Sequence, residues 1–111
     1  MGIATAQFRL SYLLLFKSDL EEKMSQITQT KLGLTSTSSE LMNLGTELEP
    51  ESPELKLLMQ RKDRLKFIED QLTNQMEIYK TQLQAIEAEV QSVESLKNSE
   101  IKRAFSYGVG G

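Results

Sequence analysis

The chain has 111 residues, of which 39% are hydrophobic and 26% charged, and its net charge of -3 argues against general nucleic-acid binding. It has no cysteine, histidine or tryptophan, which excludes disulfides and thiolate metal sites and removes the commonest catalytic bases and metal ligands. With only two prolines and six glycines to interrupt it, the sequence favours a single all-α domain of long helices, spanning residues 1–111.

The first predicted element is a helical arm over residues 4–48. An apolar residue recurs every seven positions along it, at Leu13, Leu20, Ile27, Leu34, Leu41 and Leu48. The alternate positions of this seam are apolar only towards the ends, at Phe16, Met24 and Leu44. Glycine, serine and threonine residues are frequent between these two ends. Serine and threonine side chains compete for backbone hydrogen bonds, and glycine loses backbone entropy in a helix. We therefore expect a kink or short break near residues 33–38; a continuous helix is the alternative.

Within this arm lies an apolar cluster that surrounds the whole helix. Its members are Leu10, Tyr12, Leu13, Leu14, Leu15 and Phe16. One partner helix cannot cover every side of such a segment, and an exposed apolar patch usually marks an interface. The cluster is far shorter than the ~20 residues of a membrane-spanning helix, and its flanks do not match a cleavable signal peptide. We expect it to bind copies of the same chain; membrane binding is disfavoured, because no basic face surrounds it.

A turn is predicted at residues 49–53. Pro50 disfavours helix at the residue before it. Ser52 is a good helix N-cap and Pro53 suits the first helical position. A short loop makes the helices on either side antiparallel neighbours, so the fold predicted is a long two-helix hairpin or coiled coil.

The second arm is predicted over residues 54–105. Apolar residues recur every seven positions at Leu58, Leu65, Leu72, Tyr79, Ile86 and Val93. The intervening apolar residues give a heptad seam with one four-residue stutter, from Leu72 to Met76. The basic run 61–66 is typical of a solvated helix surface, with polyanion binding as the alternative.

A second apolar set lies off this seam, at Leu57, Phe67, Ile78, Ala85 and Ala88. We expect Phe67 and Ile78 to contribute to an interface between copies; the alternative is that the set is scattered over the surface, as single apolar residues often are. Residues 106–111 abandon the helical pattern and form a predicted glycine-rich tail. Either this tail frays, or Phe105 and Tyr107 anchor it against a neighbouring subunit.

Catalytic, cofactor-binding and metal-binding patterns are absent from the sequence. No glycine-rich phosphate loop, calcium loop or Glu-x-x-His helix pair occurs in it. Serine and tyrosine have no candidate base other than lysine. We therefore expect a non-enzymatic protein that uses no cofactor and no small-molecule substrate.

The turn and second arm resemble the helical-hairpin subunits of bacterial type III secretion needles. The resemblance covers about residues 47–105 and rests on Pro50-Glu51-Ser52-Pro53-Glu54-Leu55, with Gln60 following and Ile101 and Phe105 near the end. The chain departs from that family in its apolar segment 10–16 and in its extension to Gly111.

The resemblance implies an exported, self-assembling subunit of a filamentous or tubular bacterial structure, located outside the cell or on its surface. The alternative is a coiled-coil adaptor or stalk protein of a secretion or flagellar export machine, which would act in the cytoplasm by docking on other components of that machine.

Overall fold

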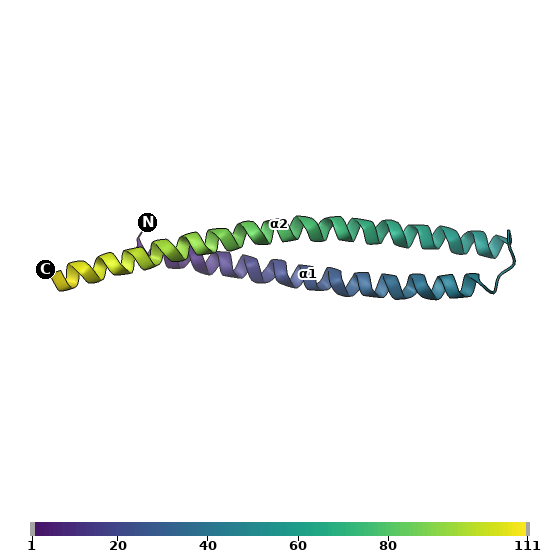
Figure 1. Ribbon diagram of the computed structural model, residues 1–111, viewed down its shortest axis with the longest axis horizontal. Coiled ribbons are helices and arrows are strands. Elements are labelled where there is room, and N and C mark those ends of the chain that lie inside the picture. The colour runs from purple at the N-terminus through teal and green to yellow at the C-terminus, as the bar shows by residue number, and fades with distance from the viewer. Residues whose placement is uncertain (1, 111) are drawn as a thin grey trace. The chain divides into compact units, whose positions relative to one another are not determined.

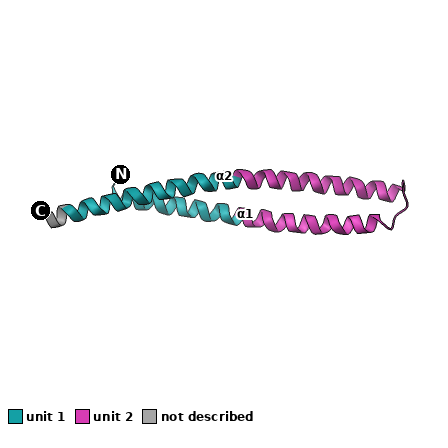
Figure 2. Cartoon of the chain, in the orientation of Figure 1, with its two compact units in different colours: residues 1–22, 79–111 teal, residues 23–78 magenta. Residues whose placement is uncertain are grey.

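A computed structural model of the protein describes residues 2–110, and describes the side chains of residues 2–106. Two helices make up the fold: α1 spans Ile3–Gly45 and α2 spans Pro53–Gly110, joined by a loop (Figure 1). The predicted all-α, antiparallel two-helix hairpin is confirmed. The chain divides into two compact units, each pairing a segment of α1 with a segment of α2 (Figure 2). Unit 1 consists of Met1–Glu22 with Tyr79–Gly111, and unit 2 is Lys23–Ile78.

The turn starts earlier than predicted, because α1 ends at Gly45 rather than near residue 48. Tight bonds replace the helical ladder there: the Glu47 amide donates to the Leu44 carbonyl at 3.2 Å and the Leu48 amide to the Gly45 carbonyl at 3.3 Å. Such i to i-3 bonds satisfy the last carbonyls of a helix as it tightens and stops.

The start of α2 is as predicted. The Ser52 hydroxyl oxygen accepts a hydrogen bond from the Leu55 amide at 3.1 Å, which makes Ser52 the N-cap, and Pro53 is the first helical residue. Glu51 reaches this cap through a backbone φ of 66°, the left-handed region that non-glycine residues seldom adopt. The predicted roles of Ser52 and Pro53 in the turn are therefore confirmed.

The buried and half-buried positions of α1 alternate in steps of three and four along its whole length. They are Ile3, Ala6, Leu10, Leu13, Lys17, Leu20, Met24, Ile27, Lys31, Leu34, Ser38, Leu41 and Gly45. Every member of the predicted ladder within α1 lies on this seam. Phe16 and Leu44 do not: they are 43% and 56% exposed, and the seam passes instead through their neighbours Lys17 and Gly45.

The seam of α2 has no stutter, which corrects the sequence prediction. Its positions are Leu55, Leu58, Lys62, Leu65, Glu69, Leu72, Met76, Tyr79, Leu83, Ile86, Val90, Val93, Lys97 and Glu100. Ile68, which suggested the stutter, is 37% exposed, and the half-buried position between Leu65 and Leu72 belongs to Glu69. The seven-residue repeat is regular because polar residues occupy some of its core positions.

The expected break near residues 33–38 is absent, and α1 is helical throughout. The Thr37 hydroxyl donates a hydrogen bond to the Gly33 carbonyl at 3.0 Å, and Thr28 and Thr30 donate to the carbonyls four residues before them. A threonine hydroxyl that bonds to a carbonyl of the preceding turn finds its partner within the helix. The side chains that compete with helix in an isolated peptide are therefore accommodated, and the continuous-helix alternative is correct.

The second arm also extends further than predicted, since α2 continues to Gly110 instead of giving way to a tail at residue 106. Residues 101–104 are mostly good helix formers, and each residue added to an existing helix gains one backbone bond at little further cost. The side chain of Tyr107 lies outside those that the structure describes, so its predicted contact stays a prediction.

The two units differ in how well they are packed. Unit 1 contains a core of Ala6, Leu13, Leu20, Ile86 and Val93, all at most 7% exposed. In unit 2, Ile27 is the one buried hydrophobic residue among those described, at 7% exposed. Lys31, Ser38, Gly45, Lys62 and Glu69 hold seam positions there, and they offer little apolar surface to bury.

One stability prediction follows from Gly33, which lies inside α1 with open space where a β-carbon would point. Glycine in a helix interior costs roughly 0.5–1 kcal/mol relative to alanine because it loses more backbone entropy. Gly33→Ala should raise the free energy of unfolding by about that amount. Urea unfolding followed by circular dichroism measures it, and a loss of stability would show that α1 is not regularly helical at this position.

Candidate interaction surface

A second apolar stripe runs along α1 in unit 1, on the side turned away from the seam, and it approaches the seam only at Phe16. It consists of Phe8, Tyr12, Leu15 and Phe16, spaced as i, i+4, i+7 and i+8, the spacing that places residues on one side of a helix. These side chains are 80%, 55%, 72% and 43% exposed. We call this set the outer stripe.

The two rings in the middle and at the end of the outer stripe, Tyr12 and Phe16, make contacts within the chain. The rings of Tyr12 and Phe16 stack with centroids 6.4 Å apart and planes 15° apart. The guanidinium of Arg9 lies 5.7 Å from the centre of the Tyr12 ring and also pairs with Glu89 of α2. A partner docking here would meet aromatic surface that loses little further freedom on binding.

Not every predicted interface residue belongs to this surface. Leu13 is 3% exposed and lies in the core of unit 1, and Leu10 packs partly buried against that core. These two residues stabilise the hairpin itself, which corrects the prediction for them. Leu14, at 45% exposed, flanks the seam, whereas Tyr12, Leu15 and Phe16 are available on the surface as predicted.

Sequence reasoning missed Phe8, the most exposed large hydrophobic residue among those described. The signal was present, since Phe8 precedes Tyr12 by four residues and Leu15 by seven. It was overlooked because Phe8 stands outside the unbroken apolar run. The helical spacing of the apolar residues defines the exposed face, whereas the unbroken apolar run of residues 12–16 does not.

On α2 the predicted residues are exposed but scattered. Phe67 and Ile78, in unit 2, are 62% and 56% exposed and stand about three helical turns apart, too far to form one patch. Leu57 is 51% exposed, and Ala85 and Ala88 are exposed as well. Phe105, in unit 1, is 71% exposed and shares its segment with Ile101, which is 46% exposed.

Charged groups bridge the two helices beside the outer stripe. Lys17 lies on the seam, with its ammonium 3.8 Å from Glu87 of α2 and 3.9 Å from Glu21 of α1. Together with the pair of Arg9 and Glu89, this contact fixes which residues of the two helices face one another in unit 1. Exposed ion pairs contribute only about 0–1 kcal/mol each, so they specify alignment more than they stabilise.

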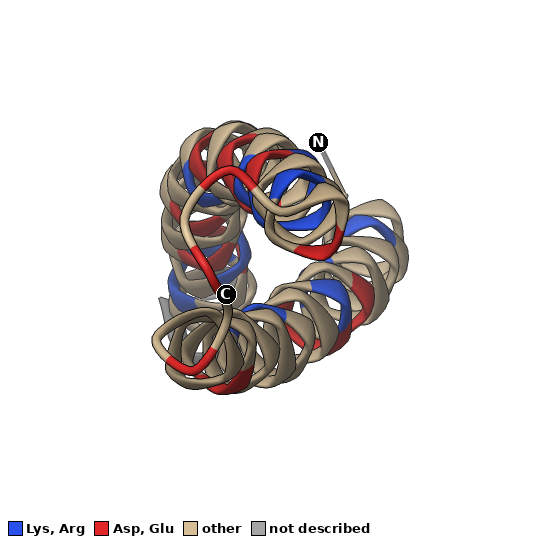
Figure 3. Ribbon diagram, turned by 90° about the vertical axis from the view of Figure 1, so that its right-hand side faces the viewer, with Lys and Arg blue, Asp and Glu red and all other residues tan. Residues whose placement is uncertain are grey.

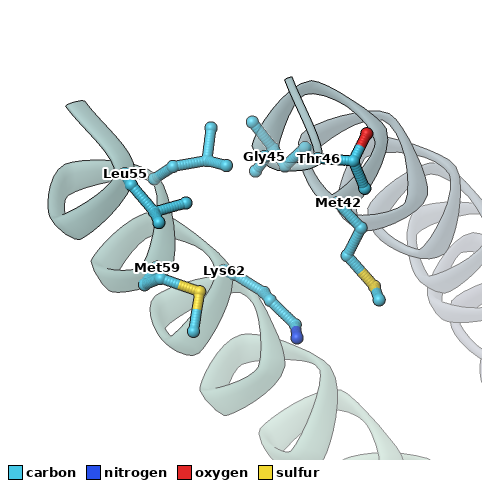
Figure 4. A pocket seen from close by; sticks show the side chains of 8 residues that line it. Met42, Gly45, Thr46, Leu55, Met59 and Lys62 are labelled. Carbon is cyan, nitrogen blue, oxygen red and sulfur yellow. The ribbon is translucent and has the colours of Figure 1, made fainter. Parts of the chain in front are cut away.

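Unit 2 contains an apolar groove of about 220 Å³ close to the turn (Figure 4). Its lining residues are Leu41, Met42, Gly45, Thr46, Leu55, Leu58, Met59 and Lys62. The side chains from α1 and α2 face one another across it, and Lys62 supplies the charged group. A groove of this composition suits an apolar side chain.

Within the residues that the structure describes, no group of three acidic side chains could hold a metal ion. No helix in that part of the chain is long and apolar enough to cross a membrane. The features available for binding are thus the outer stripe, the groove near the turn and the exposed end of α2.

Comparison with known proteins adds no family to this description: no family, no curated protein and no solved structure matches the chain. The resemblance to secretion-needle subunits therefore stays a prediction from the sequence.

Proposed function

We propose that this protein is a non-enzymatic structural subunit that assembles with copies of itself, as in a filamentous or tubular bacterial structure of the secretion-needle kind. The observation that carries the proposal is the outer stripe. Phe8, Tyr12 and Leu15 lie opposite a seam that the hairpin has already filled, so α1 presents a second helix-packing face.

A second copy is the simplest partner for that face. The stripe has the spacing of a helix-packing surface, and the same stripe on another chain offers a matching one, as in a two-fold symmetric contact. Burying a large apolar side chain contributes about 1.5–3 kcal/mol, whereas association costs about 4–15 kcal/mol. A two-fold contact buries these four side chains from each copy, so its gain and its cost are comparable in size, and it stops at a pair. A filament therefore requires a second kind of contact.

A monomeric adaptor for a secretion or export machine is the second candidate. It is favoured by the seam, which pairs α1 with α2 within one chain and so uses the main apolar face of each helix internally. Light scattering and negative-stain microscopy of the purified chain separate the two functions. Oligomers or filaments support the structural subunit, whereas monomers throughout the range of tens of micromolar overturn it and leave the adaptor.

The outer stripe is tested by Leu15→Lys, which places a charge on its most exposed aliphatic side chain. We expect association between copies to weaken by about tenfold or more, because the ammonium must lose water on contact. Gln29→Lys is the matched control, since it adds the same charge at an exposed position of α1 outside the stripe. Equal association constants for the two variants would show that the stripe is not the contact.

A further inference from the structure

The groove near the turn is lined at one point by a seam position that has no side chain. Gly45 ends α1 at a position where the repeat places a core residue. A β-carbon on Gly45 would lie 3.0 Å from Cδ2 of Leu58 and 3.6 Å from Cδ1 of Leu55, so the two helices approach closely at that point. Met42 and Met59, 54% and 50% exposed, form a flexible rim that can adapt to a guest.

Among the described residues, the one charged residue that lines the groove is Lys62, whereas the turn next to the groove is acidic. The adjoining loop and first turn of α2 carry Glu47, Glu49, Glu51 and Glu54, all exposed. Figure 3, which looks onto the turn, shows acidic positions in red on the ribbon of the loop. An apolar guest with basic neighbours would therefore be attracted to this part of unit 2.

The end of α2 carries that combination. The repeating burial of the seam stops at Glu100, and residues 101–106 are all exposed. Phe105 is 71% exposed and Ile101, one helical turn before it, is 46% exposed. Lys102 and Arg103 lie between them, and the Arg103 guanidinium approaches the Glu100 carboxylate only to 3.7 Å.

We propose that the end of α2 in one copy docks at the turn of the next copy, with Phe105 in the groove and Lys102 and Arg103 facing the turn glutamates. Phe105 is a large apolar side chain, and a groove of about 220 Å³ with a mainly apolar lining suits one. Because the two surfaces differ, the contact repeats from copy to copy and gives an open chain of subunits.

This inference rests on the proposed function and supplies the additional contact that the outer stripe requires. The absence of cysteine from the sequence makes it directly testable by disulfide trapping. Met42→Cys and Ser106→Cys are prepared as separate chains, mixed and oxidised. We expect a disulfide-linked heterodimer as the main product. Ser25→Cys, exposed on α1 away from the groove, replaces Met42→Cys in the control mixture and should give several-fold less.

Other arrangements give other products. A predominance of homodimers of the Met42→Cys chain would mean that two turns meet, and a predominance of homodimers of the Ser106→Cys chain would mean that two ends of α2 meet. Either result overturns the proposal. Equal trapping with Met42→Cys and Ser25→Cys would also overturn it, because it would reflect random collision.

The contact is tested without cysteine by Phe105→Ala, with Phe105→Leu as the conservative variant. We expect the alanine variant to weaken end-to-end association about tenfold and the leucine variant to weaken it only slightly, because leucine still fills an apolar groove. Raising the salt concentration should weaken association of the wild type more than that of a Lys102→Gln/Arg103→Gln variant.

The outcomes distinguish this inference from the proposed function. If the wild type forms oligomers and Phe105→Ala forms the same oligomers with the same affinity, the docking of α2 is wrong while self-assembly stands. If the wild type is a monomer throughout, both are wrong. If Phe105→Ala loses filaments but retains pairs that Leu15→Lys abolishes, both contacts are supported.

Discussion

Replacing Leu20 with alanine is expected to lower the free energy of unfolding by about 3 kcal/mol, within the range of about 2–5 kcal/mol for removing a buried leucine side chain. Leu20 is 2% exposed and belongs to the core of unit 1, where residues of both helices enclose it. The substitution leaves a cavity there, since a helix pair has little freedom to close over it. Urea unfolding, at a concentration where both proteins have the same oligomeric state, measures the difference.

Leu34→Ala is the matched control for this prediction. Leu34 occupies the equivalent seam position in unit 2, where it is only half-buried. Its loss should cost about 1 kcal/mol, because less apolar surface returns to water. Equal costs at the two positions would contradict the conclusion that the stabilising core lies in unit 1.

The second large effect is expected in the opposite direction. Glu69→Leu should raise the free energy of unfolding by about 1 kcal/mol, because a half-buried seam position in unit 2 would gain an apolar side chain. Glu40→Leu makes the same chemical change at an exposed position of α1 and should shift stability by no more than about 0.5 kcal/mol.

The Glu69 comparison also tests the regular heptad. If the seam of α2 passed through Ile68, as the apolar residues alone suggest, Glu69→Leu would behave like Glu40→Leu. Ile68→Glu would then be severely destabilising, whereas we expect a smaller cost, because Ile68 flanks the seam and is 37% exposed. The two substitutions together decide where the seam lies.

The hairpin and its capped turn were predictable because they depend on strong local signals. Every predicted seven-residue repeat position in α1 and α2 is buried or half-buried, and Ser52 caps α2 as its position before Pro53 indicates. Polar seam positions were not predictable in this way. Nothing in the chemistry of Glu69 or Lys17 suggests a core position, and only the alignment of two whole helices assigns it.

The continuity of the helices was underestimated for a related reason. Helix propensity describes an isolated segment, and the segment 33–38 is weak by that measure. In the folded chain, the hydrogen bond from Thr37 to Gly33 and the packing on either side of this segment accompany a continuous helix. The prediction also ended the second arm too early, at residue 105, because it did not take the cooperativity of helix formation into account.

The candidate surfaces were predicted only in part. Tyr12, Leu15 and Phe16 were identified, but Leu10 and Leu13 were assigned to the same surface because an apolar run does not reveal which side faces the second helix. The groove could not be foreseen at all, since it depends on Gly45 taking a core position beside Leu55 and Leu58.

The placement of the core has a consequence for how fast the chain folds. A helical hairpin most easily closes first near its turn, where few residues separate the contacts, but that end holds the polar seam positions of unit 2. The contacts that stabilise most, such as those of Ala6 and Val93, join residues near opposite ends of the sequence. Most of the ordering entropy is therefore lost before the strongest contacts form, and we infer a folding rate below that of a hairpin whose core adjoins its turn.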